Sequence, residues 1–250
     1  MKIIISGALG AMGRTIAANA ANFGVEVAAG VDREASDALA FPVYEGFANC
    51  PTDVDVVIDF SHPSNLPNVL AFSKANNIPA VIATTGMSDE DIASIKETAK
   101  SVPLFFTFNM SLGVNLLCQL AKHAASVLGE GFDVEIIEKH HNKKIDAPSG
   151  TAIMLANSVS EGLSYEPRLV YERHSVRQRR EPNEIGMHAI RGGTIVGDHD
   201  IIFAGHDEVI TLSHSAQSKE VFAVGSVNAA VFLAGKPAGM YAMADLIKAE

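Results

Sequence analysis

Over residues 2–109, short runs of β-branched residues alternate with longer segments of helical character, and this alternation constrains the fold more than any other feature. The strand-like runs are 2–6, 25–31, 54–60, 79–86 and 103–109, and the helix-like segments are 12–23, about 63–76 and about 88–100. The run Val56-Val57-Ile58 shows no polar alternation, as expected of a strand buried on both faces of a parallel sheet. Because right-handed helical crossovers join parallel strands, the pattern predicts a doubly wound α/β fold.

From residue 111 the pattern changes. It predicts a helix to about residue 128, a strand over 132–140, a helix that begins near Gly150, and several strands within 186–215. The turns between those strands are predicted at Gly192-Gly193, Gly197-Asp198 and Gly205-His206-Asp207. This second part is therefore expected to be an α+β domain with an open mixed sheet.

The segment 219–235 is again helical and apolar, and we expect it to pack on the first domain. The predicted domains are 1–109 together with 218–250, and 110–217.

Charge and cysteine content exclude several classes of protein. The net charge of −10 argues against a nucleic-acid partner, and the densest basic segment, Arg177, Arg179 and Arg180, is interpreted as a solvated loop face. Cys50 and Cys118 fit neither a disulfide framework nor the spacing of metal ligands, so a reducing cytoplasm and no metal are expected. No apolar stretch approaches the roughly 20 residues that cross a bilayer, so no membrane partner is expected.

A glycine turn, Gly7-x-x-Gly10-x-x-Gly13, follows the first strand and precedes a helix. Glycines there allow a tight turn and close approach of the backbone to a pyrophosphate, which the free N–H groups of the helix start can bind. A purely structural turn is the alternative, and Asp32 weakens it, because an acidic residue at the end of the next strand can bind ribose hydroxyls. Arg33 could pair with a 2′-phosphate, so the sequence permits NADH and NADPH alike. The first domain is thus predicted to be a Rossmann-like dinucleotide-binding domain.

Other turns fall at the carboxyl ends of strands, where open α/β sheets bind ligands: Asp59-Phe60-Ser61, Ala83 to Gly86, and Phe108-Asn109. None of the four tyrosines has a lysine four residues later, which disfavours the short-chain dehydrogenase class. A Walker A lysine and a His-Glu-x-x-His pattern are also absent from the sequence.

Residues 135–152 concentrate chemically active side chains. A continuing strand would turn His140 and His141 to opposite faces and would place Lys144 about 13 Å from His140. We expect the chain to curl into a loop after His141, so that these three residues can surround one ligand.

Pro148-Ser149-Gly150-Thr151 predicts a helix start whose hydroxyls and free N–H groups can bind a carboxylate. With Lys144, the segment suits a small dianion. A metal site at the histidine pair and a helix cap without a ligand remain alternatives.

This segment resembles the signature of the dihydrodipicolinate reductase family, also called the 4-hydroxy-tetrahydrodipicolinate reductase family. The matching positions are Glu135, Ile136, Glu138, His140, Lys144, Asp146, Pro148, Ser149, Gly150, Thr151 and Ala152. The resemblance extends over essentially the whole chain, through the glycine turn and the stretches VVIDFSHP, ATTG, FNMSLGVN and IRGGTIVGDH. Departures are Ala83, where many members have glycine and a glycine-compatible backbone is expected, and Asp32 and Asp198, where glutamate is common.

The resemblance implies reduction of 4-hydroxy-tetrahydrodipicolinate, a cyclic imine dicarboxylate, to tetrahydrodipicolinate with NADH or NADPH in lysine and diaminopimelate biosynthesis. It implies His140 as proton donor and acceptor and Lys144 as a proton donor, with substrate bound by His141, Lys144, Ser149, Gly150 and Thr151. The cofactor residues it implies are Gly7, Ala8, Leu9, Gly10, Ala11, Met12, Asp32, Arg33, Ala83, Thr84, Thr85, Thr107, Phe108, Asn109 and Met110. It further implies a homotetramer built through the sheet of the second, substrate-binding and oligomerisation domain, and a C-terminal helix that returns to the nucleotide domain.

Two other functions remain open. One is a dehydrogenase of another small amino-dicarboxylate, such as an aspartate or homoserine dehydrogenase, which the contiguous pattern around His140 disfavours. The other is a nonenzymatic NAD(H)-sensing module, which would need a cofactor site but would not need His140 with Lys144.

Overall fold

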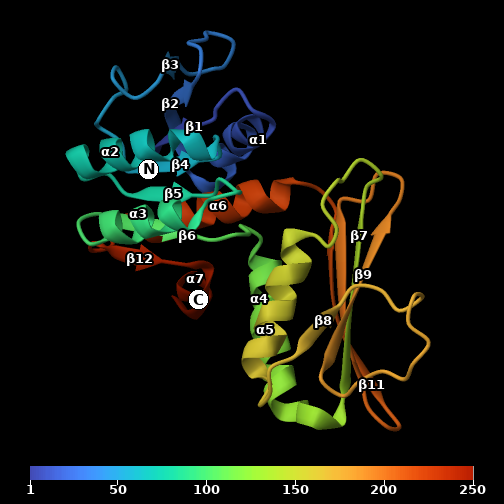
Figure 1. Ribbon diagram of the computed structural model, residues 1–250. Helices are drawn as coiled ribbons and strands as arrows, with labels where there is room; N and C mark the ends of the chain where they lie inside the picture. Colours follow the sequence, from blue (N-terminus) through green and yellow to red (C-terminus); the bar gives the residue numbers. More distant parts are fainter. Residues whose placement is uncertain (250) are drawn as a thin grey trace. The chain divides into compact units, whose positions relative to one another are not determined.

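The computed structural model describes residues 1–249, so the last residue of the predicted first domain, Glu250, lies outside the described residues. The chain forms two compact units (Figure 1). The first unit contains Met1–Leu112 together with the chain from Glu220 onward, and the second contains Gly113–Lys219.

The first unit is built on a seven-stranded sheet in which all neighbouring strands are parallel. Its order is β12-β6-β5-β4-β1-β2-β3, so the strand order reverses between β1 and β4. The strands are β1 (Lys2–Ser6), β2 (Glu26–Asp32), β3 (Val43–Glu45), β4 (Val56–Asp59), β5 (Ala80–Ile82), β6 (Pro103–Phe106) and β12 (Gly239–Tyr241). This topology confirms the predicted doubly wound, Rossmann-like fold. The short edge strands β3 and β12 were not predicted, since three residues carry too little periodic signal.

Both faces of this sheet are covered by helices, which explains why its strands are continuously apolar. Successive side chains of a strand point to opposite faces, so Ile3 and Ile5 join one core cluster and Ile4 joins the other. The helices of this unit are α1 (Ala11–Ala20), η1 (Ala21–Phe23), η2 (Pro63–Asn65), α2 (Leu66–Asn76), α3 (Asp89–Ala99), α6 (Glu220–Leu233) and α7 (Met243–Ala249). Residues of α1 and α6 belong to the first cluster, and residues of α2 and α3 belong to the second.

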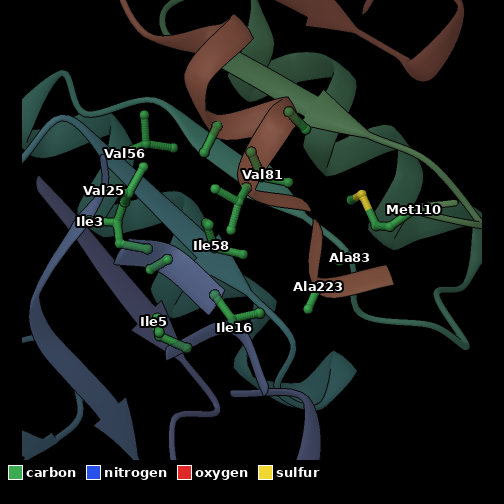
Figure 2. Close-up of a cluster of buried hydrophobic side chains, with 14 of the residues drawn as sticks. Ile3, Ile5, Ile16, Val25, Val56, Ile58, Val81, Ala83, Met110 and Ala223 are labelled. Carbon is green, nitrogen blue, oxygen red and sulfur yellow. The ribbon is translucent and has the colours of Figure 1, made fainter. Parts of the chain in front are cut away.

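The late helix α6 packs on the first cluster, as the sequence predicted. Ala223 lies in this cluster with Ile16 of α1 and Ile58 of β4 (Figure 2). Gly225 permits this close approach, because a Cβ atom there would lie 1.7 Å from the carbonyl oxygen of Met110.

The second unit pairs two helices with a five-stranded mixed sheet of order β11-β10-β7-β9-β8. Its elements are α4 (Leu112–Leu128), η3 (Gly129–Gly131), β7 (Asp133–His140), α5 (Gly150–Gly162), β8 (Arg168–Val170), β9 (Glu184–Arg191), β10 (Gly197–Ala204) and β11 (Val209–Ala216). Strand β7 is antiparallel to β10 and parallel to β9, which confirms the predicted mixed sheet. Figure 1 shows α4 in green and α5 in yellow, side by side along one face of this sheet.

Alternation along β7 decides which residues face those helices. Val134, Ile136, Glu138 and His140 are buried, whereas the residues between them are partly exposed. The apolar members pack against α4 and α5. Because side chains alternate along the strand, Glu138 and His140, at its end, also point to the helix-covered face.

Two sequence predictions for this unit were wrong. Gly197 and Asp198 do not form a turn; they open β10, where Gly197 pairs with Ala216 and Asp198 pairs with both Ser215 and Lys139. Pairing with strands on both sides outweighs the local turn preference of a Gly-Asp dipeptide.

Arg180 is not a solvated loop residue, although Arg177 and Arg179 are exposed. Its guanidinium donates to the carboxylates of Asp133 and Glu135, 2.7 and 3.0 Å away, and so fastens the loop between β8 and β9 to the sheet.

Both cysteines are free thiols, and burial raises the pKa of the Cys50 thiol to about 11. Among residues 1–249, no helix has the length and apolar character that crossing a membrane would require.

Candidate functional site

The glycine turn after β1 has the geometry that its sequence predicts. Gly7 has φ +82°, and a Cβ atom on it would lie 2.5 Å from the carbonyl oxygen of Phe60. A Cβ on Gly13 would lie 2.2 Å from the carbonyl oxygen of Gly7. Gly10 caps α1 without a side-chain hydrogen bond, so the first N–H groups of that helix are left for an anion.

A pocket of about 760 Å³ opens beside this turn, at the carboxyl ends of the central strands of the first unit. It is lined by Gly7, Leu9, Gly10, Val31, Asp32, Arg33, Glu45, Gly46, Phe60, Ser61, His62, Ser64, Asn65 and Asn68. The position is the one at which open α/β sheets bind nucleotides, where the strand order reverses. Five predicted cofactor residues therefore meet in one pocket: Gly7, Leu9, Gly10, Asp32 and Arg33.

The pocket also contains polar residues that sequence reasoning missed. Glu45 and Gly46 come from the end of the short edge strand β3, while His62 and Asn65 come from the turn that leads into α2. His62 lies in the family-like stretch VVIDFSHP, which could have pointed to it, but no sequence motif marks Glu45, which reaches the pocket through the pairing of β3 with β2.

Asp32 connects the end of β2 to the glycine turn. Its Oδ2 accepts a hydrogen bond from the N–H of Leu9 at 2.9 Å, and its Oδ1 accepts from the N–H of Arg33 at 2.8 Å. Each carboxylate oxygen has a second lone pair, so the side chain can still accept from ribose hydroxyls. The side chain of Arg33 is exposed at the pocket wall.

The other predicted cofactor residues lie at the ends of β1, β5 and β6 but do not line this pocket. Ala8 is fully buried, and Met110 lies in the core cluster drawn in Figure 2. Ala11 and Met12 belong to the first turn of α1. Thr85, Thr107, Phe108 and Asn109 follow β5 and β6, and the Phe108 ring is 65% exposed.

Ala83 keeps an ordinary backbone. Among residues 1–249, the non-glycine residue with positive φ is Asn77, so Ala83 has a negative φ, which glycine and alanine both adopt, and its contact with nicotinamide stays a prediction. Alanine follows β5 here without backbone strain.

A buried carboxylate, Asp59, supports the turns after β4 and β5. It accepts from the Ser61 hydroxyl at 2.6 Å and from the Thr84 hydroxyl at 2.7 Å. Burial raises the pKa of Asp59, although these hydrogen bonds oppose the shift. The hydroxyl of Thr84 is therefore turned into the protein, and the N–H of Ala83 donates to the carbonyl of Asp59 at 2.9 Å.

In the second unit, His140 is held by a neighbouring carboxylate at the end of β7. Its Nδ1 lies 2.6 Å from Oε2 of Glu138, and its ring packs edge-on against His199 with centroids 5.2 Å apart. The His140 side chain is 10% exposed and that of Glu138 is 1% exposed.

Arg191, to which no role was assigned from the sequence, completes this arrangement. Its Nη1 and Nη2 donate to the two oxygens of Glu138 at 2.8 and 2.7 Å, and Nη2 also donates to the carbonyl of Asp146 at 2.6 Å. Burial raises the pKa of Glu138, but the hydrogen bonds from Arg191 and His140 outweigh burial and hold that pKa below its usual value. Glu138 is therefore a carboxylate at neutral pH.

Ser149 caps α5, as its sequence predicts. Its hydroxyl accepts from the N–H of Ala152 at 3.1 Å and lies 3.1 Å from Nε2 of His199. The side chain is buried, so the hydroxyl holds the helix start and His199. Gly150 is exposed at the first turn of the same helix, beside Thr151.

The strand ends at His140, and the chain then curls into a loop one residue earlier than predicted. The N–H of Lys144 donates to the carbonyl of His141 at 3.1 Å. Nζ of Lys144 lies 2.8 Å from Oδ2 of Asp146, and that hydrogen bond lowers the pKa of Asp146. Nδ1 of His141 is buried and has no hydrogen-bond partner among residues 1–249. Two cationic or basic groups thus lie in the loop that joins His140 to the start of α5.

His199 is buried and neutral. Burial, and next the charge of His140, lower the pKa of His199 to about 4. Because the neutral form is favoured only in the folded state, the stability that this residue contributes is complete above pH 6.5 and is lost as the pH falls toward 4.

We therefore expect His199→Gln to flatten the pH dependence of stability. Between pH 7 and pH 5 the natural protein should lose about 2 kcal/mol of unfolding free energy more than the variant, since one pKa unit corresponds to about 1.4 kcal/mol. Urea unfolding followed by circular dichroism at both pH values measures this difference. The control is His206→Gln, which replaces a side chain that is 97% exposed. This variant should lose as much unfolding free energy between pH 7 and pH 5 as the natural protein. An equal loss of unfolding free energy between pH 7 and pH 5 in His199→Gln and the natural protein would contradict the expectation.

Two family models together match nearly the whole chain. The model described as dihydrodipicolinate reductase, N-terminus, matches residues 1–110, and the model described as dihydrodipicolinate reductase, C-terminus, matches residues 113–247.

Individual relatives agree with these matches. A protein from Caldanaerobacter subterraneus subsp. tengcongensis named 4-hydroxy-tetrahydrodipicolinate reductase is 51% identical over 249 residues, which are 99% of this chain and 98% of that relative. A protein of the same name from Clostridium novyi is 46% identical over 250 residues, which are 100% of this chain and 99% of the relative.

Among solved structures, the chain is similar to the dipicolinate-bound dihydrodipicolinate reductase from Paenisporosarcina sp. TG-14. The TM-score is 0.77 at 24% identity, with 97% of both chains covered. At this level of identity the likeness concerns the fold, and it agrees with a parallel sheet and a second, mixed sheet in one chain.

Proposed function

The chain belongs to the dihydrodipicolinate reductase family, and we propose which of its residues carry out each part of that family's reaction. The enzyme reduces 4-hydroxy-tetrahydrodipicolinate to tetrahydrodipicolinate in lysine and diaminopimelate biosynthesis. Substrate and product differ by one hydroxyl group, so one hydride and one proton enter and one water leaves. Bound NADH or NADPH supplies the hydride, and the protein's residues must bind the dicarboxylate and provide the proton.

The nucleotide pocket of the first unit suits the coenzyme. Residues Gly7 to Met12 would hold the pyrophosphate through the backbone, because a side chain at Gly7 or Gly13 would collide with neighbouring carbonyls. Asp32 would accept from ribose hydroxyls, and Arg33 would contact a 2′-phosphate when NADPH is bound. Ala83 to Thr85 and Thr107 to Met110 would contact the nicotinamide end, mainly through backbone groups.

Replacement of Arg33 by alanine is expected to raise KM for NADPH about tenfold or more, because hydrogen bonds to charged groups contribute about 1.5–3 kcal/mol. KM for NADH should change much less, since NADH lacks the 2′-phosphate. Steady-state kinetics with both coenzymes measure the ratio, and Arg33→Lys, which keeps the charge, should give an intermediate value. Equal changes for NADH and NADPH would remove Arg33 from this role.

The proton donor proposed is His140, and the observation that carries this proposal is its hydrogen bond to the buried carboxylate of Glu138. Loss of water from the substrate gives a conjugated imine, and hydride addition to it pushes electron density onto nitrogen and the adjacent carbon, so a protonated donor lowers the barrier. A histidine can give up and regain a proton near neutral pH. With Nδ1 bound to Glu138, Nε2 is the nitrogen left to carry that proton.

Substrate binding is assigned to the loop and helix start that follow His140. Lys144, His141 and the first N–H groups of α5, at Gly150 and Thr151, would bind the carboxylates. Ser149 would act by holding this helix start in place. The similar protein from Paenisporosarcina binds dipicolinate, which carries two carboxylates as this arrangement requires.

We assign assembly to the sheet face that α4 and α5 leave uncovered. Alternation in the strands places Ile137, Ile190, Ile202 and Val209 on that face, and Ile190 and Val209 are 47% and 62% exposed. Pairing of such faces would bury these side chains and would build the homotetramer expected of the family. A cytoplasmic location is proposed with it, in keeping with two free thiols.

The function is tested by following NADPH absorbance with substrate freshly generated from pyruvate and aspartate semialdehyde. Rapid NADPH oxidation that requires both precursors is expected. Oxidation with aspartate semialdehyde alone would indicate a homoserine dehydrogenase, and oxidation with oxaloacetate and ammonia would indicate an aspartate dehydrogenase. Nucleotide binding without turnover in any mixture would indicate a sensor.

A further inference from the structure

We propose that Glu138 is a positioning residue: it holds His140 by Nδ1, so that Nε2 carries the transferred proton and faces the substrate. This inference deepens the function proposed above and rests on the role of His140 given there.

The first argument is the register of β7. Glu138 and His140 lie two residues apart, so both side chains point to the helix-covered face, and Nδ1 and Oε2 meet at 2.6 Å. A carboxylate only accepts hydrogen bonds, so Nδ1 must carry hydrogen in both the neutral and the charged form of His140. The tautomer is thereby fixed, and Nε2 alone changes its protonation.

The space beside Nε2 supports this orientation. Gly197 of β10 is adjacent, and a Cβ atom on it would lie 3.0 Å from Nε2. A side chain at position 197 would therefore crowd Nε2.

The second argument is that Glu138 is itself immobilised as an anion. Its two oxygens accept four hydrogen bonds, from His140, from both Nη atoms of Arg191 and from the N–H of Ser149 at 3.1 Å. Arg191 also donates to the carbonyl of Asp146. The Glu138 carboxylate thus holds the proton donor. It also holds both ends of the segment 146–149 that leads into α5: Ser149 directly, and Asp146 through Arg191.

The proton balance follows from this geometry. His140 releases the Nε2 proton to the substrate, the bonding electron pair stays on Nε2, and the ring becomes the neutral Nδ1–H tautomer. Glu138 exchanges no proton; its charge stabilises the imidazolium before transfer. Other titratable groups beside His140 are Arg191 of β9 and His199 of β10, and His141, Lys144 and Asp146 follow it in the loop.

A purely structural ion pair between Glu138 and Arg191 is the competing explanation, and β7 contains a matched control. Glu135 lies on the opposite face, where its Oε2 lies 2.7 Å from Nε2 of His188 and its Oε1 accepts from Arg180 and Arg173. Glu135→Gln therefore removes a comparable glutamate–histidine–arginine cluster of the same strand without touching His140.

The experiment compares Glu138→Gln, Glu138→Asp and Glu135→Gln in the full chain. Glu138→Gln should lower kcat about 10- to 100-fold, within the range of acid–base effects, with KM for NADPH unchanged. Loss of the negative charge destabilises the imidazolium, so the descending limb of the kcat/KM profile should shift to lower pH. Glu138→Asp keeps the negative charge, so the descending limb should stay at its natural pH while kcat falls. Glu135→Gln should leave the profile unchanged.

Nitrogen-15 NMR of the His140 ring provides a readout that does not depend on turnover or on a variant. The natural protein should show the Nδ1–H tautomer, and Glu138→Gln should show a mixture of tautomers. An Nε2–H tautomer in the natural protein, or a natural pH profile in folded Glu138→Gln, would overturn the inference. Full activity of a His140 variant would instead overturn the proposed function, whatever the tautomer.

Discussion

His140→Ala is expected to lower kcat by about 10²-fold or more, the usual effect of removing a general acid. The variant keeps Glu138 and Arg191 paired, and it leaves the nucleotide pocket of the first unit untouched. Hydride transfer would then have to draw its proton from water, while binding of NADPH should stay the same. Steady-state kinetics with freshly generated substrate, together with NADPH titration by fluorescence, measure both quantities.

The control for this substitution is His206→Ala. His206 is 97% exposed in the turn between β10 and β11, at the opposite end of β10 from Gly197, which lies beside His140. Its kcat should equal that of the natural protein. An unchanged kcat in folded His140→Ala would remove His140 from the reaction and would make Lys144 the remaining candidate for the donor.

Lys144→Ala should have an effect of similar size, about 10²-fold in kcat/KM, because the substitution removes a charged partner for a substrate carboxylate and a residue that the family resemblance implies as a proton donor. Stability should change little: the partner of Lys144 in the loop, Asp146, is 60% exposed, and exposed ion pairs contribute about 0–1 kcal/mol. Thermal unfolding and steady-state kinetics check these two statements separately.

Lys144→Arg separates the two roles of this residue. Arginine keeps the positive charge but does not release a proton, so a variant that restores KM while kcat stays low indicates proton donation. Recovery of both constants indicates carboxylate binding alone. The adjacent Lys143, which is exposed, gives the matched control, and Lys143→Ala should behave as the natural protein. A loss in Lys143→Ala as large as that in Lys144→Ala would show that the effect comes from general loss of charge in the loop.

Local sequence signals were sufficient wherever a structure is decided by neighbouring residues. The unbroken apolar run of β4 predicted a strand buried on both faces, and the Ser149 cap predicted the start of α5. The glycine turn was also predictable, because the backbone positions at Gly7 and Gly13 have no room for a side chain. These features depend on steric exclusion and on hydrogen bonds that span only a few residues.

The sequence predictions failed where residues far away in the sequence changed the local structure. A turn was predicted at Gly197 and Asp198, yet Gly197 pairs with β11, and Asp198 pairs with both β11 and β7. Arg180 was predicted to be solvated, yet carboxylates 45 and 47 residues away bind its guanidinium. The edge strand β3, which brings Glu45 to the nucleotide pocket, has three residues and no periodic pattern.

By itself, then, the sequence determined the doubly wound and mixed-sheet architecture and the identity of the residues around His140, because burial patterns and contiguous motifs are written along the chain. Only the tertiary structure decided that Arg191, 53 residues beyond Glu138, binds that carboxylate, and that Glu138 in turn holds His140. The physical reason is that the pairing of β7 with β9 brings Arg191 beside His140, and a buried carboxylate there requires hydrogen-bond partners that no local pattern specifies.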